Sequence, residues 1–192
     1  MSELVKTPPF RASYASVFKP QTNILSGKSE YSIVALFPKG TDFSELTAAA
    51  EAALKAKFGN DKTKWPKNLR SPFRDQKERA KDDGSLPPGY QEGAVMITLR
   101  STSRPGVVDQ NVNSLGVEYG NDAEFYSGCW ARATVRAYAY DNAGNRGVSF
   151  GLGNIQKVKD DQPLGANRTK PEDDFQAIGA EASQASATDI FS

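Results

Sequence analysis

Residues 129–140 have the sequence Cys-Trp-Ala-Arg-Ala-Thr-Val-Arg-Ala-Tyr-Ala-Tyr, and the alternation within it determines the expected architecture. Successive side chains of a β-strand point to opposite faces. One face carries the cysteine, four alanines and Val135, which fits the tightly curved interior of a small β-barrel. The other face carries larger polar and aromatic side chains: Trp130, Arg132, Thr134, Arg136, Tyr138 and Tyr140. The segment therefore predicts a barrel strand with a small inner face and a large outer face.

The outer face of this strand is typical of a surface that binds unpaired nucleotides. Aromatic rings stack on bases, and guanidinium groups pair with phosphates. We therefore predict contacts with single-stranded DNA from Arg132, Arg136, Tyr138 and Tyr140. The alternative is that the rings pack beneath a helix or a long loop and form part of the core, with Trp130 as the first candidate.

Four further segments have the composition and periodicity of strands. They are residues 10–18, 31–37, 94–103 and 147–158. The last of these follows a turn at residues 141–145, where Asp, Asn and Gly predict a hairpin with the preceding strand. Together the segments indicate a mainly β chain with a five-stranded barrel.

One α-helix is expected over residues 42–58. Apolar side chains follow helical spacing there, and Gly59 stands where a helix commonly ends. Asp42 and Glu45 have the spacing of a reciprocal cap at the first turn. The alanine-rich body of this helix suits packing against a sheet or the end of a barrel, and we assign it no further function.

A long basic loop connects the helix to the next strand, over residues 60–93. Loops of this length are usually functional or disordered. Between residues 62 and 81 it carries eight cations against Asp75 and Glu78, with Trp65 and Phe73 among them. The cations are Lys62, Lys64, Lys67, Arg70, Arg74, Lys77, Arg79 and Lys81. We expect the loop to close over a DNA strand and follow its backbone; the alternative is a solvated run of charge whose aromatic rings anchor the loop.

The charge of the chain is unevenly distributed although its net value is only +1. Residues 160–192 carry seven acidic and two basic side chains, a net charge of −5, which leaves +6 on residues 1–159. A basic body with an acidic tail is common among nucleic-acid-binding proteins.

Three parts of the chain follow from this pattern. Residues 1–9 end in two prolines and are expected to form a flexible arm, and residues 10–170 to form the binding domain, although the core pattern itself stops after residue 159. Residues 171–192 have the small, polar composition of an acidic, disordered tail. Its tip, Asp189, Ile190 and Phe191, could dock on a partner protein, or be inert as most chain ends are.

Several classes of chemistry are disfavoured by what the sequence lacks. It has no histidine and one cysteine, Cys129, so histidine-based catalysis and ordinary structural zinc are excluded. It also lacks a phosphate-binding P-loop and a complete dinucleotide-binding glycine motif. We expect no cofactor, no metal and no enzymatic activity. A nuclease that binds metal through carboxylates alone is the least favoured alternative, since the acidic pairs fall in loops or in the tail.

The location follows from similar observations. No apolar run approaches the length of a membrane span, and the N-terminus has no signal-like core. A single cysteine fits a reducing compartment. We therefore expect a protein of the cytoplasm that does not enter membranes.

Four segments resemble a bacteriophage family long catalogued as a domain of unknown function and now regarded as single-stranded-DNA-binding proteins with an OB-fold. They are residues 104–109, 124–133, 138–148 and 151–158. The segments Arg11-Ala-Ser-Tyr14 and Gln162-Pro-Leu-Gly165 also look like this family. The resemblance covers roughly residues 10–175.

The resemblance implies an OB-like barrel that coats single-stranded DNA with little sequence preference during phage replication or recombination, in the cytoplasm of a bacterial host. It also implies an acidic tail that restrains DNA binding and recruits replication or recombination proteins, as in the T7-like phage proteins. Arg100 and Arg104, in and after the strand 94–103, complete the expected DNA-contacting set. A structural or adaptor phage protein without DNA binding remains an alternative, and the oligomeric state is open, a homo-oligomer included.

Overall fold

The computed structural model describes residues 3–22, 24 and 27–165. The expected tail at residues 171–192, including Asp189, Ile190 and Phe191, lies outside the described residues. Within them no helix has the length and apolar character that crossing a membrane requires.

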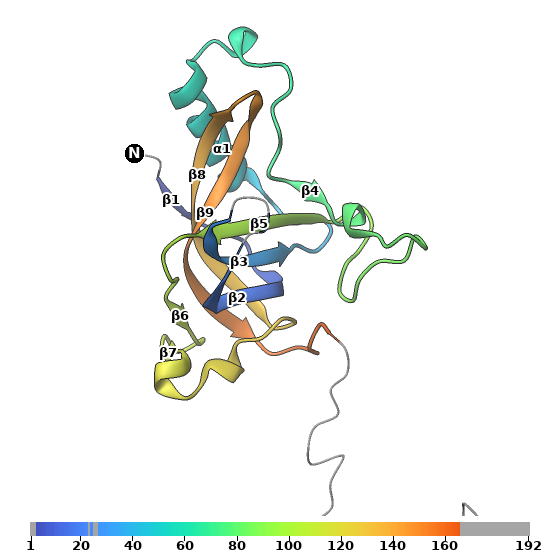
Figure 1. The fold of residues 1–192 in the computed structure, drawn as a ribbon, viewed down its shortest axis with the longest axis vertical. Helices are drawn as coiled ribbons and strands as arrows, with labels where there is room; N and C mark the ends of the chain where they lie inside the picture. The colour runs from blue at the N-terminus through green and yellow to red at the C-terminus, as the bar shows by residue number, and fades with distance from the viewer. Residues whose placement is uncertain (1–2, 23, 25–26, 166–192) are drawn as a thin grey trace, which may run out of the picture.

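The described chain is built mainly from strands (Figure 1). The long strands are β2 (Phe10–Thr22), β3 (Ser29–Leu36), β5 (Val95–Ser101), β8 (Trp130–Asn142) and β9 (Asn145–Lys159). The short ones are β1 (Leu4–Lys6), β4 (Arg74–Asp75), β6 (Val107–Val108) and β7 (Ser114–Leu115). The α-helix is α1 (Ser44–Phe58).

The five long strands close into a ring in the order β2–β3–β5–β9–β8 and back to β2. Neighbours are antiparallel except for β5 and β9, which run parallel and pair at Arg100 and Gly151. These five strands correspond to the five segments predicted from the sequence. The mainly β fold and the five-stranded barrel are therefore confirmed.

The two faces of β8 are confirmed as well. Cys129, just before the strand, and Ala131, Ala133, Val135 and Ala137 within it are all buried inside the barrel. They pack in one core with large residues from the other strands, including Phe10, Ile33, Leu99 and Phe150. Small residues on β8 therefore make room for large ones across the barrel.

The N-terminal segment is more ordered than expected. Leu4–Lys6 form β1 and pair with residues 134–136 of β8, so the prediction of a flexible arm is wrong for these residues. The Thr7 amide also donates to the Ala133 carbonyl at 2.8 Å, and the Thr7 hydroxyl accepts from the Ala133 amide at 3.0 Å. The physical reason is that β8 pairs with β2 only at its start, and its remaining edge groups need partners.

The helix begins at Ser44, two residues later than predicted, and Phe43 at the cap position makes no side-chain cap bond. Asp42 instead accepts a hydrogen bond from the Ser44 amide at 2.9 Å. Leu46, Ala50 and Ala53 are the buried residues of α1, and they belong to the barrel core. The helix lies along β8 and β9 (Figure 1).

Residues 160–165 form a strap that folds back over the barrel, although the sequence pattern of the core stops at residue 159. The Asp161 carboxylate accepts from the Trp130 indole at 2.8 Å, which lowers the pKa of Asp161. Arg11 donates to the Gln162 carbonyl at 2.8 Å. Leu164 packs on a second apolar cluster outside the barrel wall: Val34, Leu36, Leu86, Tyr90 and Met96. Single apolar residues and long-range polar contacts hold the strap, so the sequence has no periodic pattern that predicts it.

Candidate nucleic-acid interface

A groove of about 870 Å³ lies on the outside of the barrel, between the loop that contains β4, the strand β5 and the β8–β9 hairpin. Six of the residues predicted to contact DNA line it: Arg70, Phe73, Arg74, Arg100, Tyr138 and Tyr140. They come from three segments separated by many residues in the chain. The fold therefore brings cations from the loop and from β5 beside the aromatic end of β8.

The loop wall of the groove is held by backbone pairing at both of its ends. The Arg70 amide donates to the Arg146 carbonyl at 2.8 Å, and the Val148 amide donates to the Arg70 carbonyl at 3.2 Å. Further on, Arg74 pairs with Met96 of β5 as part of β4. The loop thus spans from β9 to β5 across the side of the barrel on which these two strands make their sparse parallel contact.

Phe73 is half-buried and fixes this wall to the core. Its ring meets Phe43 at 5.5 Å and Phe150 at 5.9 Å between centroids, both edge-to-face. Phe43 in turn meets Phe37, which meets Phe10, so an aromatic series runs from the groove into the barrel. Phe73 therefore serves the loop as an anchor while it lines the groove.

The strand register places outward residues of β5, β9 and β8 in a row, of which Arg100 lines the groove and Arg136 does not. Arg100 of β5 lies beside Gly151 of β9, and Gly151 lies opposite Arg136 of β8. Arg100 and Arg136 are both exposed, and Tyr138, on the same face as Arg136, is 49% exposed. A bound strand could therefore place phosphates near the arginines and a base against the tyrosine ring.

The outward face of β9 carries almost no side-chain bulk along this row, because its residues are Gly147, Ser149, Gly151 and Gly153. Packing explains two of these glycines. A Cβ at Gly147 would lie 2.5 Å from the Arg70 carbonyl oxygen, and one at Gly153 would lie 2.5 Å from the Thr134 hydroxyl. At Gly151 the nearest atom would be 3.7 Å away, an ordinary contact. Glycine at 151 is thus not required by packing, and it leaves the floor between two arginines open.

The first part of the basic loop lies away from the groove. Lys62, Lys64, Trp65 and Lys67 follow the end of α1, and none of them lines the groove. The Trp65 indole donates to the Gly59 carbonyl at 2.8 Å. Lys62 reaches Glu51 at 3.0 Å; hydrogen bonds from Lys55 and Lys62 lower the pKa of Glu51 to about 2. Lys62 and Trp65 thus make local contacts at the end of the helix.

Three other predicted cations are paired elsewhere. Lys77 makes an ion pair with Glu92. Arg104 makes one with Glu118 at 2.6 Å, in a separate hollow beside Tyr119. Arg132 donates to the Gln156 side chain at 2.8 Å. Arg79, a cation of the predicted basic loop, lines the groove too, as does Glu78, which forms an ion pair with Arg74. The groove also contains residues that sequence reasoning did not select, among them Thr98, Asn142, Asn145 and Ser149.

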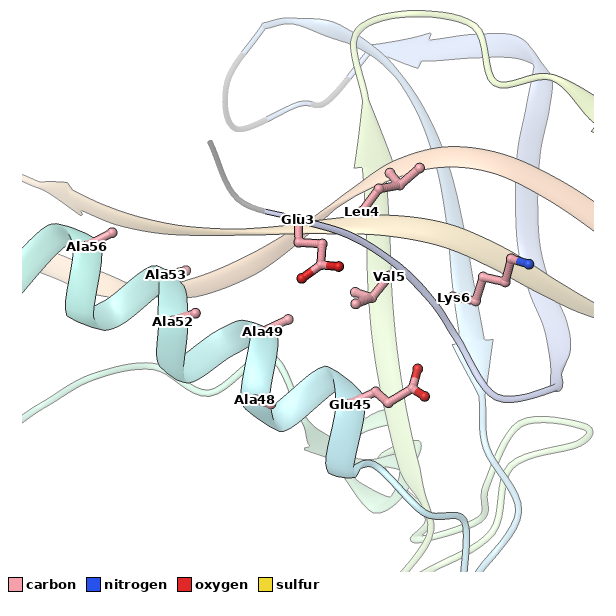
Figure 2. A pocket seen from close by; sticks show the side chains of 10 residues that line it. All are labelled: Glu3, Leu4, Val5, Lys6, Glu45, Ala48, Ala49, Ala52, Ala53 and Ala56. Atoms are coloured by element: carbon pink, nitrogen blue, oxygen red, sulfur yellow. The ribbon is translucent and has the colours of Figure 1, made fainter.

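A second groove, of about 820 Å³, lies between β1 and α1 (Figure 2). Its helix side is lined by alanines, and the carboxylates of Glu3 and Glu45 stand on either side of Val5. Lys6 is the one cation among its lining residues. Two carboxylates against one ammonium disfavour a polyanion, so the first groove is the candidate nucleic-acid interface. Across residues 3–165, apart from 23, 25 and 26, no group of three or more Cys, Asp or Glu side chains is arranged to hold a metal ion.

A small closed β-barrel with cations and aromatic rings on its outer wall is the architecture of OB-like nucleic-acid-binding domains. The chain belongs to the family of the single-stranded-DNA-binding protein of Enterobacter phage Enc34, whose family model matches residues 3–187. This confirms the resemblance seen in the sequence.

Individual relatives agree with this assignment. A protein of Acyrthosiphon pisum secondary endosymbiont phage 1 is 30% identical over 164 residues, covering 81% of this chain and 83% of that protein. The single-stranded-DNA-binding protein of bacteriophage Enc34 in complex with single-stranded DNA has a TM-score of 0.66 at 25% identity, covering 84% of this chain and 89% of that one. The single-stranded-DNA-binding protein of bacteriophage T7 shares the fold, with a TM-score of 0.57 at 14% identity over 88% of this chain and 99% of that one.

The glycine geometry predicts opposite effects for one substitution at two neighbouring outward positions of β9. Gly151→Ala should raise the free energy of unfolding by about 0.5–1 kcal/mol, because alanine loses less backbone entropy on folding and its methyl group meets no close atom. Gly153→Ala should lower it, because the new methyl group would collide with Thr134. Urea unfolding followed by circular dichroism measures both. A destabilised Gly151→Ala variant would contradict an open groove floor.

Proposed function

We propose that this protein binds single-stranded DNA with little sequence preference and coats it during phage replication or recombination, in the cytoplasm of the bacterial host. One observation carries the proposal: the fold gathers Arg70, Arg74 and Arg100 beside the exposed ring of Tyr138 in one open groove. Membership of a phage single-stranded-DNA-binding family supports it.

The chemistry of the groove accounts for a low sequence preference. Every base has a flat face that stacks on an aromatic ring, and every nucleotide has a phosphate that pairs with a guanidinium. Arg100 and Arg136 lie on either side of Gly151, at a spacing that the strand pairing fixes. Contacts from these arginines to phosphates do not depend on which bases the strand carries. The activity proposed is binding, without a chemical step.

Electrostatic attraction should dominate the affinity. If about four or five phosphates are neutralised, the logarithm of the binding constant should fall with the logarithm of salt concentration at a slope near −3, from about −0.7 per contact. Fluorescence anisotropy of a labelled oligonucleotide measures this slope. A protein adaptor without DNA binding would give no anisotropy change, and a nuclease would cut the oligonucleotide when magnesium is added. A slope near zero would exclude a cationic groove.

Stacking on Tyr138 supplies the second test. Tyr138→Ala should weaken oligonucleotide binding by about 1–3 kcal/mol if a base stacks there. Tyr119→Ala is the matched control, because Tyr119 is 59% exposed but lies in the hollow beside Arg104, outside the groove. Both variants should keep the circular dichroism spectrum of the parent. Equal affinities of the Tyr138 variant and the parent would mean that the bases do not use this face of β8.

We propose two roles for residues 171–192, which carry five acidic and no basic side chains. As an acidic tether they would compete with DNA for the groove, and their tip at Asp189, Ile190 and Phe191 would bind a replication or recombination protein.

A chain ending at residue 171 should therefore bind DNA more tightly than the full chain at low salt. The gain should shrink as salt screens the competing charges. The same anisotropy titration, run on both chains, measures it. Identical binding at low salt would remove the competition role, and a pull-down of replication proteins with Phe191→Ala would then test the docking role alone.

A further inference from the structure

Tyr14 has two properties that do not serve the stability of the barrel. Its backbone φ is +45°, in the left-handed region that residues other than glycine rarely adopt. Its side chain is 62% exposed, although it stands within β2 among core residues. Strained backbone of this kind clusters at functional sites, so the exposed side chain of Tyr14 is a candidate for a role in binding.

The strain at Tyr14 is imposed by the surrounding backbone. The register of β2 against β3 shifts between Ser13 and Ser16, which marks a β-bulge. The Gly128 amide donates to the Ala12 carbonyl at 2.8 Å on one side of Tyr14. On the other side, the Ala15 amide donates to the Ser127 hydroxyl at 3.0 Å. The bulge is therefore fixed at both ends, and it holds the tyrosine ring outward.

The bulge belongs to the same outer wall as the groove. Ser13 lies opposite Val34 of β3, Val34 lies opposite Thr98 of β5, and Thr98 lines the groove. Because directly paired residues share a face of a sheet, Ser13 faces the same side as the groove residues. Counted through β3, β5 and β9, four interstrand spacings of about 4.8 Å separate β2 from β8, which carries Tyr138, or roughly 19 Å around the wall. The ring closes where the start of β8 pairs with the start of β2.

Beside Tyr14 is a small hollow of about 150 Å³. Pro87, Pro88 and Tyr90 also line it. The Tyr90 hydroxyl lies 3.3 Å from the Ser13 hydroxyl. Burial raises the pKa of Tyr90, and its hydrogen bond with Ser13 acts in the opposite sense.

We propose that Tyr14 is a second base-stacking position, where one base of a bound single strand lies against the phenol ring beside Pro87 and Pro88. A nucleobase fits this surface because the rings of Tyr14, Pro87 and Pro88 are apolar, and the hydroxyl groups of Ser13 and Tyr90 lie at their edge. This inference rests on the proposed function and extends its binding surface from β8 to β2.

The test compares three substitutions at Tyr14 in the full chain, with an oligonucleotide of about 16 nucleotides, the upper site size of such a fold. Tyr14→Ala should weaken binding about 5- to 150-fold, the loss expected for one stacked base. Tyr14→Phe should bind like the parent, because it keeps the ring. Tyr14→Gly should lose affinity like the alanine variant, yet melt at the same temperature or higher, because glycine adopts positive φ without strain.

The outcomes separate this inference from the function on which it rests. If the parent binds and Tyr138→Ala weakens binding, but both Tyr14→Ala and Tyr14→Gly bind like the parent, Tyr14 is not a stacking position and the groove assignment stands. If Tyr14→Gly lowers both the melting temperature and the affinity for the oligonucleotide, the role of Tyr14 is structural and the inference is wrong. If the parent binds no oligonucleotide in conditions where it is folded, the proposed function itself fails.

Discussion

The closure of a five-stranded ring limits what β8 can carry on its inner face, and the other features of the molecule depend on that limit. Cys129, Ala131, Ala133 and Ala137 are buried with almost no exposed surface, and they leave space for Phe10 and Phe150 across the core. Since successive residues of a strand alternate, the larger residues of β8 must face outward. The small inner face that lets the barrel close thus leaves the arginines and tyrosines of β8 on its outer face.

Closure is least complete between β5 and β9, which pair at Arg100 and Gly151. The loop from Arg70 to Arg74 spans this region and pairs with both strands. The loop thus completes the wall of the barrel and also forms one side of the groove. Structural closure and the candidate interface use the same backbone, so substitutions in this loop affect stability and binding together.

The sequence predicted the five barrel strands, the two faces of β8 and the family, because each depends on local alternation or on contiguous motifs. It did not predict β1, the strap at residues 160–165, or which loop cations reach the groove. Those depend on partners far along the chain: β1 pairs with β8, and the strap with Arg11 and Trp130. Counting charges likewise cannot distinguish Arg70, in the groove, from Lys62, paired with Glu51. The strain at Tyr14 is a property of one backbone torsion angle, which residue composition and hydrophobic periodicity do not report.

The aromatic series that ends at Phe73 has a thermodynamic consequence. Because edge-to-face rings tie the groove wall to the core, the protein loses little conformational freedom when a ligand enters, and the flexible polymer bears most of the ordering entropy. Differences in affinity among sequences should then reflect how strongly each DNA strand stacks on itself before it is captured. A DNA strand whose bases stack on one another when free must give up that stacking to follow the groove, whereas a flexible DNA strand has little stacking to lose.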